Sequence, residues 1–112
     1  MKNQDIIKTI ARLDGWINLT HLIDRTDIWT HPRTNIHCHT GEFNYLKSRD
    51  AILPVIEKQP KLVQINIVIL LKDIVCRGAD CPPELVVNIL MVLATASQLC
   101  EALLRATGKW KD

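Results

Sequence analysis

The chain has 112 residues, of which 47% are hydrophobic, and its 14 Lys and Arg against 12 Asp and Glu give a formal net charge of +2. This length predicts one domain over residues 1–112, without room for separate catalytic and regulatory domains. The apolar content excludes a disordered chain, and no run of like charges reaches the length typical of a nucleic-acid arm or a membrane patch, so the charge pattern names no partner.

The first predicted element is an amphipathic helix near the N-terminus. It starts at residues 3–5, ends at Asp14-Gly15, and has apolar residues at helical spacing: Ile6, Ile7, Ile10, Ala11 and Leu13. The segment lacks an apolar stretch of signal-peptide length, and the longest apolar run, at 67–71, falls far short of the ~20 residues that span a bilayer. We expect no export and no membrane insertion.

Residues 16–40 have the pattern of a small antiparallel β region, because β-branched and aromatic residues in short runs are separated by polar turns. A second helix is expected over 42–59, kinked by Pro54. The apolar run at 62–76 is ambiguous by period, but its length favours a helix over a strand. The short apolar run at 85–93 is compatible with either a helix or a strand.

The last helix, 95–107, is the best defined of the predicted elements. Thr95 and Gln98 have the spacing of a capping box, and Gly108 ends the helix. Together these elements predict an α+β fold, in which the antiparallel β region at about 16–40 packs against four to five helices.

Three histidines and a cysteine lie within nine residues of the predicted β region. On a strand, His37 and His39 point to the same face, where they could chelate Zn²⁺ or Cu²⁺ with His31 or His21 as a third ligand. The alternative is a polar strand that faces solvent, with Cys38 turned into the core. We favour the alternative, because the chain contains neither an HExxH nor a CxxC motif, and we predict no metal and no other cofactor.

The other cysteines give little indication of chemistry. Because the chain lacks a secretion signal, we expect reduced thiols and no structural disulfide. Cys76 and Cys81 could form a structural zinc site with Cys38 and a histidine, but their spacing is wider than that of the usual zinc pair. Cys100 is most simply a small buried hydrophobe. No carboxylate pair, thiol–base pair or Gly-rich loop has the spacing of a catalytic motif, so we predict that the chain is not an enzyme.

Basic and aromatic residues interleave at 24–33. Arg25, Trp29, His31 and Arg33 could there form a flat cationic surface that binds a protein partner, since Trp and Arg are favoured interface anchors. The same surface could bind single-stranded nucleic acid by stacking. The alternative is that Trp29 packs inward.

Three segments of the chain resemble a set of small proteins encoded by tailed bacteriophages and prophages. A helix ending in Gly15-Trp16, the segment YLKSRDAILPVIEK at 45–58 and the closing motif ATASQLCEALLRATGKW at 94–110 follow one another in the order found in those proteins. The chain thus resembles the phage ABA-sandwich type of domain over about half its length. The resemblance implies a phage or prophage origin and a location in the bacterial host cytoplasm, and it implies no catalytic residue.

We therefore expect a non-enzymatic phage or prophage accessory protein that binds a host or phage protein, for example as an inhibitor of a host defence system such as a CRISPR effector. A metal-binding module or small metalloenzyme built on His37 and His39 is the first alternative. A nucleic-acid-binding module using Arg25, Trp29 and Arg33 is the second. The apolar excess in 62–93 leaves both a monomer and a homodimer open.

Overall fold

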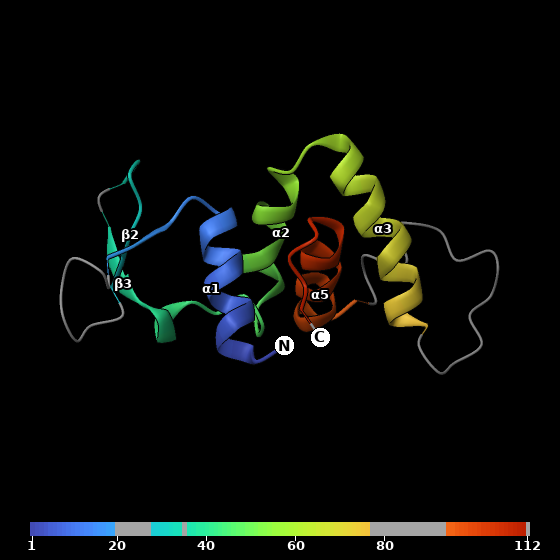
Figure 1. Cartoon of the computed structure of the whole chain (residues 1–112), viewed down its shortest axis with the longest axis horizontal. Coiled ribbons are helices and arrows are strands. Elements are labelled where there is room, and N and C mark those ends of the chain that lie inside the picture. The colour runs from blue at the N-terminus through green and yellow to red at the C-terminus, as the bar shows by residue number, and fades with distance from the viewer. Residues whose placement is uncertain (20–27, 35, 77–93, 112) are drawn as a thin grey trace.

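The structure is a computed structural model and describes residues 1–19, 28–34, 36–76 and 94–111. In this part of the chain, four α-helices and one 3-10 helix accompany a three-stranded antiparallel sheet, so the fold is α+β, as predicted. The elements, in chain order, are α1 (Asn3–Leu13), β1 (Ile17–Asn18), β2 (Ile28–Thr30), β3 (His37–His39), η1 (Thr40–Glu42), α2 (Arg49–Glu57), α3 (Lys61–Val75) and α5 (Ala96–Ala106). The sheet lies at one end of the molecule and α3 towards the other (Figure 1).

Helix α1 has the predicted period and bounds, and its buried residues lie on one face: Ile6, Ile10 and Ala11. The chain leaves the helix at Gly15, whose φ of +96° is a conformation that glycine adopts at little cost. The N–H of Trp16 then donates to the carbonyl of Ala11 at 3.0 Å. This turn directs the chain from the helix into the sheet.

The strands lie inside the predicted β region in the order β1-β2-β3. Trp29, in the middle strand, pairs with Asn18 on one side and with Cys38 on the other. Trp29 is fully buried, so this row faces the core. Because side chains alternate along a strand, the neighbouring row faces the opposite side, and its members are Ile17, Thr30 and His37.

Helix α2 begins at Arg49, later than the start of the predicted segment. The chain between the sheet and α2 is instead occupied by η1 and by a turn in which the N–H of Ser48 donates to the carbonyl of Asn44 at 2.9 Å. Pro54 lies inside the helix on its exposed side.

The ambiguous run forms the helix α3, which is the assignment that its length favoured. Its buried residues face α5, and they are Ile67, Leu71 and Ile74. The strand-like alternation of the sequence arises because Ile65 and Ile69 point outward from the same helix. The run at 85–93 lies outside the described residues.

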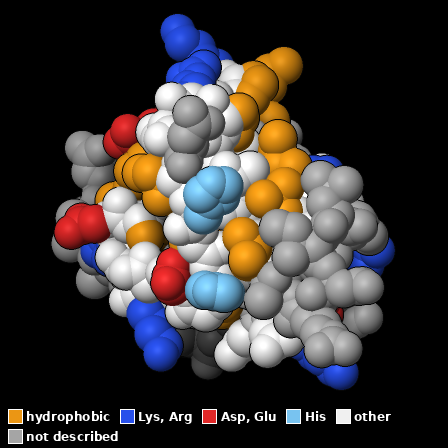
Figure 2. All heavy atoms as spheres, turned by 90° about the vertical axis from the view of Figure 1, so that its left-hand side faces the viewer, with side chains coloured by type: hydrophobic (Ala, Val, Ile, Leu, Met, Phe, Trp, Pro, Cys, Tyr) orange, Lys and Arg blue, Asp and Glu red, His pale blue; other side chains and the backbone are white. Residues whose placement is uncertain are grey.

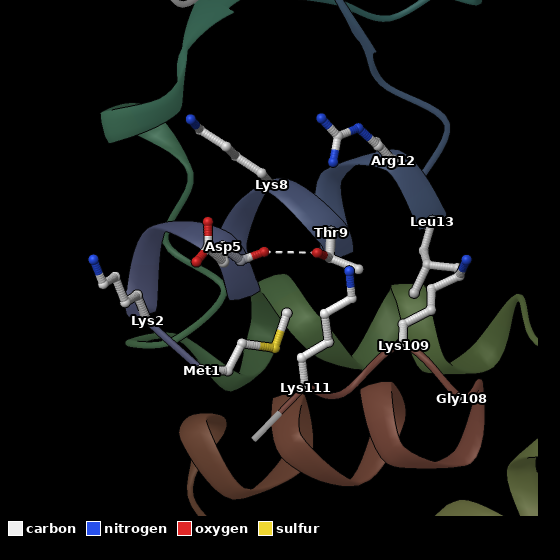
Figure 3. A pocket seen from close by; sticks show the side chains of 10 residues that line it. All are labelled: Met1, Lys2, Asp5, Lys8, Thr9, Arg12, Leu13, Gly108, Lys109 and Lys111. Carbon is white, nitrogen blue, oxygen red and sulfur yellow. Dashed lines mark hydrogen bonds between the residues drawn. The ribbon is translucent and has the colours of Figure 1, made fainter.

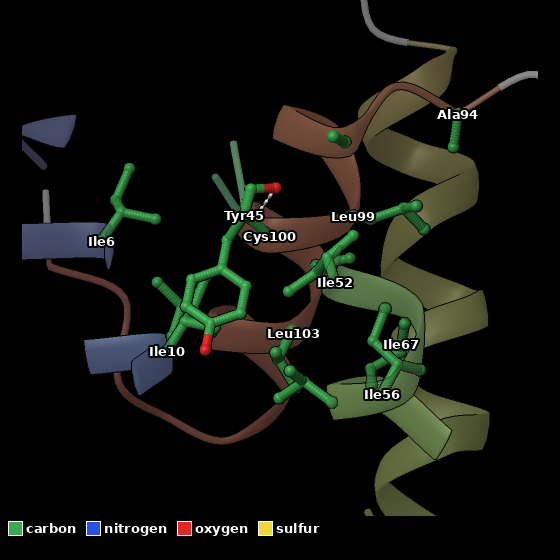
Figure 4. Packing of buried hydrophobic residues seen from close by; sticks show 14 of the residues in the cluster. Ile6, Ile10, Tyr45, Ile52, Ile56, Ile67, Ala94, Leu99, Cys100 and Leu103 are labelled. Atoms are coloured by element: carbon green, nitrogen blue, oxygen red, sulfur yellow. Dashed lines mark hydrogen bonds between the residues drawn. The ribbon is translucent and has the colours of Figure 1, made fainter. Parts of the chain in front are cut away.

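Helix α5 is the centre of the hydrophobic core, and it contacts α1, α2 and α3. In Figure 4, Leu99, Cys100 and Leu103 of α5 lie among side chains from the other helices, such as Ile10 and Ile67. Six of the eleven residues of α5 are buried, which explains its central position: Ala96, Leu99, Cys100, Ala102, Leu103 and Leu104.

Both ends of α5 are stabilised as the sequence predicted. The Thr95 side chain accepts from the N–H of Gln98 at 3.1 Å, and the Gln98 side chain accepts from the N–H of Thr95 at 2.9 Å. At the other end Gly108 has φ +73°, and the N–H of Lys109 donates to the carbonyl of Leu104 at 2.8 Å. The residues after α5 therefore fold back along the molecule towards α1.

The expectation that the chain contains no structural disulfide was wrong. Cys76, which follows the last turn of α3, is disulfide-bonded. Cys38 and Cys100 are free thiols. That expectation rested on the cell compartment, which does not determine which cysteines lie close together.

None of the helices that the structure describes combines the length and apolar character needed to cross a membrane.

Candidate functional site

An aromatic cluster joins the sheet to the end of α1. Trp16 makes edge-to-face contacts with His31 and Phe43, at centroid distances of 5.2 and 5.1 Å. Phe43 also contacts Trp29 edge to face at 5.8 Å and stacks on Tyr45 at 5.5 Å. Such ring pairs stabilise by roughly 0.5–1.5 kcal/mol beyond the burial of their area. The cluster is therefore a structural support for the β region.

The sequence predicts a contact surface of Arg25, Trp29, His31 and Arg33. In the structure Trp29 does not lie on the surface. Its ring is fully buried, and its Nε1–H donates to the Thr40 hydroxyl at 2.8 Å. The sequence left open whether Trp29 lies on this surface or packs inward, and in the structure it packs inward, because the row of the sheet that contains it faces the core and the indole N–H has a buried acceptor. Arg25 lies outside the described residues.

The structure does bring His31 and Arg33 together. They line a depression of about 420 Å³ with Asp14 and Lys58. The carboxylate of Asp14 makes two polar contacts at this depression. Lys58 Nζ lies 2.6 Å from its Oδ1, and the Tyr45 hydroxyl donates to its Oδ2 at 2.9 Å. Because both carboxylate oxygens accept hydrogen bonds, Asp14 connects the end of α1 to the segment before α2 and to the residue that follows α2.

The ring of His31 is held between two backbone groups. Its Nε2 lies 3.2 Å from the carbonyl of Asp14, and the N–H of Arg33 donates to its Nδ1 at 3.3 Å. A carbonyl only accepts and an N–H only donates, so the contacts fit the neutral ring with its proton on Nε2. His31 thus positions the turn that carries the exposed Arg33.

His37 and His39 are both exposed on the strand β3 and point to the same side, as predicted. Figure 2 looks onto this end of the molecule and shows histidine side chains beside acidic and hydrophobic ones. Among the described residues, no group of three His, Cys, Asp or Glu is close enough to hold a metal ion. His31 faces the Asp14 carbonyl instead, and His21 lies outside the described residues.

The two free thiols are poor nucleophiles. Burial, with the Glu42 carboxylate as a second cause, raises the pKa of Cys38. Burial raises the pKa of Cys100 to about 12, and its Sγ donates to the carbonyl of Tyr45 at 3.3 Å. Since the thiolate is the reactive species, both thiols are in the unreactive form at neutral pH.

Helix α3 carries an apolar row on its outer side. Leu62, Ile65 and Ile69 are 76, 56 and 59% exposed. Their spacing of three and four residues places them on one face of the helix, opposite to the buried residues that contact α5. We refer to these three residues as the outer stripe. Exposed polar and charged residues accompany it on the same helix: Lys61, Asn66, Lys72 and Asp73.

A cleft of about 1020 Å³ lies between α1 and the residues that follow α5. We refer to it as the cationic cleft, because its lining includes five cationic side chains and one carboxylate: Lys2, Lys8, Arg12, Lys109, Lys111 and Asp5. In Figure 3, Lys109 and Lys111 point from the tail towards α1. This cleft was not predicted from the sequence, because its charges come from the two ends of the chain and form no continuous run.

Comparison of the chain with protein-family models, with curated proteins and with solved structures found no match to any of them. The resemblance to phage ABA-sandwich proteins therefore stays a prediction.

Proposed function

We propose that the chain is a non-enzymatic accessory protein of a phage or prophage that acts in the bacterial host cytoplasm by binding another protein through the outer stripe. The observation that carries the proposal is the exposure of Leu62, Ile65 and Ile69, each by more than half, on one face of α3. Scattered exposed aliphatic residues are common on protein surfaces, but an aligned row on one helix is typical of a recognition face.

The physical argument rests on the two apolar faces of α3. One face packs on α5 and stabilises the fold, whereas each residue of the outer stripe is more than half exposed in the isolated chain. Fully burying a Leu or Ile side chain is worth roughly 1.5–3 kcal/mol, and because these three are between 56 and 76% exposed, covering them supplies about 3–6 kcal/mol before the cost of association. A helix face with this spacing fits an apolar groove on a partner.

Two further observations support binding rather than catalysis. The free thiols have raised pKa values, and both carboxylate oxygens of Asp14, in the depression with His31, already accept hydrogen bonds. The resemblance of three segments to phage proteins supports the proposed origin. Inhibition of a host defence system, such as a CRISPR effector, is one activity that a small protein of this kind would perform by binding alone.

The test is site-specific photo-cross-linking in bacteria that express the chain, with and without phage infection. The cross-linking residue replaces Ile65 in one variant and Ile36 in the control, because Ile36 is an exposed isoleucine of nearly equal exposure, 57%, beside the sheet. We expect one discrete adduct with a host or phage protein from position 65 and none from position 36.

The purified pair should then bind, and Ile65→Lys should weaken the affinity by about thirtyfold, the equivalent of about 2 kcal/mol, while Ile36→Lys leaves it unchanged. Equal adducts from both positions, or none from position 65, would refute the proposal. An adduct between two copies of the chain would replace it with a homodimer.

A further inference from the structure

Helix α3 is held differently at its two ends. At its start, the side-chain amide of Gln64 donates to the carbonyls of Glu57 and Gln59 at 3.2 and 2.8 Å, which ties the first turns to the end of α2. At its end, the chain continues from Val75 into Cys76, which is disulfide-bonded. The first anchor consists of hydrogen bonds that a redox reaction does not alter, whereas the second is a covalent bond that a reductant breaks.

The last turn of α3 is the part of the helix that gains most from an anchor. The last four carbonyls of a helix have no partner within it, so a helix end opens more readily than its middle. The N–H of Cys76 donates to the carbonyl of Lys72 at 3.0 Å, and Ile74 is buried in the core. A disulfide at Cys76 restricts the states that the chain reaches when this turn opens, and it therefore favours the closed turn.

The end that the disulfide holds also carries part of the outer stripe. Ile69 lies about two helical turns before Cys76, whereas Leu62 lies in the first turn of the helix, close to Gln64. Opening of the last turns would therefore reach Ile69 and leave Leu62 in place. In the opened state a partner would lose one of the three apolar side chains that it covers.

The free thiols of the chain do not attack this disulfide at neutral pH. Attack on a disulfide requires a thiolate. Burial raises the pKa of Cys100 to about 12, and burial together with the Glu42 carboxylate raises the pKa of Cys38, so both stay protonated. Cys76 itself is only partly buried. The electrons that break its disulfide therefore come from a dithiol outside the chain, of the kind that keeps cytosolic thiols reduced.

We propose that the Cys76 disulfide is a redox-sensitive device that regulates the outer stripe, an inference that rests on the proposed function. In the disulfide form the last turns of α3 are closed and the stripe is complete. One thiolate of a dithiol attacks a sulfur of the disulfide and forms a mixed disulfide, which the second thiolate resolves. Two electrons and two protons pass to the chain, which gains two thiols, and the dithiol becomes a disulfide. The reduced form binds the partner more weakly.

The test follows hydrogen exchange of the backbone amides by mass spectrometry, in the full chain before and after reduction with dithiothreitol. Alkylation under denaturing conditions should add two more groups to the reduced chain, which establishes that the disulfide has opened. We expect exchange at residues 72–76 to become about tenfold faster on reduction, and exchange at residues 64–68 to change by less than about twofold.

Two variants separate the disulfide from other effects of the dithiol. Cys76→Ser should exchange like the reduced chain without treatment, and dithiothreitol should not change it further. Cys38→Ser alters a free, partly buried thiol and should respond like the wild type. Unchanged exchange at 72–76 on reduction would overturn the proposal. Unfolding of the whole reduced chain, detected by circular dichroism, would also overturn it, because the disulfide would then support the entire fold rather than one helix end.

The partner that is cross-linked from position 65 supplies the second readout. The reduced chain should bind it about fivefold more weakly than the disulfide form does. Equal affinity of the two forms would overturn the regulation of the outer stripe and leave the proposed function intact. Failure to capture any partner from position 65 would overturn both, whereas the exchange at 72–76 would still report whether the disulfide holds the end of α3.

Discussion

Gly15 is the residue on which the connection from α1 to the sheet depends. Its φ of +96° disfavours any other residue, and a Cβ added there would lie 3.3 Å from Nε2 of His31. We expect Gly15→Ala to lower the free energy of unfolding by about 1–2 kcal/mol. Gly41→Ala is the matched control, because a Cβ there meets no atom within 4 Å. Urea denaturation of both variants tests this, and equal stability would contradict it.

The buried thiol of Cys100 makes the protein less stable as the pH rises in the alkaline range. Its pKa is about 12 in the folded protein, against an ordinary value of 9.0, so between these values the unfolded chain loses a proton that the folded chain keeps. Stability therefore falls as the pH rises above about 9, by about 1 kcal/mol between pH 9 and 10 for this group.

Cys100→Ala should reduce the fall in stability by that amount, measured by urea denaturation at both pH values. The fall that remains in the variant has contributions of the same sign from Cys38 and Tyr45, whose pKa values are also raised by burial. An identical fall in the wild type and in Cys100→Ala would contradict the assignment.

Single residues also show how far the sequence could be interpreted. The spacing of Thr95 and Gln98 predicted the capping box, because a cap is a local feature. The sequence did not show to which face of the sheet Trp29 points. Side chains alternate between the two faces of a strand, but this alternation does not indicate which face packs against the helices. The contacts of His31 with the carbonyl of Asp14 depend on residues far apart in the sequence.

At the scale of elements, the capping box accounts for where α5 begins. Thr95→Ala removes the side-chain acceptor of the Gln98 N–H, and we expect it to lower the free energy of unfolding by about 1 kcal/mol. Ser97→Ala alters an exposed residue of the same helical turn and serves as the control, with an expected change within about 0.5 kcal/mol. Thermal denaturation distinguishes the two, and an equal loss in both variants would count against the cap.

The two apolar faces of α3 should respond differently to substitution. Leu71 is fully buried, and Leu71→Ala should cost about 2–5 kcal/mol. Ile69 is 59% exposed, and Ile69→Gln should change the stability by no more than about 0.5 kcal/mol. A large loss from Ile69→Gln, measured by urea denaturation, would mean that the outer stripe is covered in the isolated chain.

The elements with local signals were predicted closely, whereas those shaped by tertiary contacts were not. Helices α1 and α5 have helical spacing and clear ends in the sequence. The period of α3 was hidden because apolar residues occupy both its faces. The start of α2 was placed too early, because Tyr45 belongs to the aromatic cluster and bonds to Asp14 rather than continuing the helix.

At the scale of the whole molecule, the outer stripe and the cationic cleft are separate. The outer stripe lies on α3 and the cationic cleft on α1 and the tail, and α5 lies between these two helices (Figure 1). The cleft could not be predicted from a chain with nearly balanced charge, because folding brings the lysines of both ends together. The sequence predicted only an excess of apolar residues in this region and not the outer stripe itself. The spacing of apolar residues does not show which face of a helix packs against the core.

The central claim is that the outer stripe is the surface through which the protein acts. Its most direct test is the affinity for the cross-linked partner, measured by calorimetry for Ile65→Lys and for Lys109→Gln/Lys111→Gln. We predict that Ile65→Lys loses about thirtyfold in affinity and that the cleft variant binds like the wild type, because the two surfaces lie on different elements. Undiminished binding by Ile65→Lys would contradict the claim.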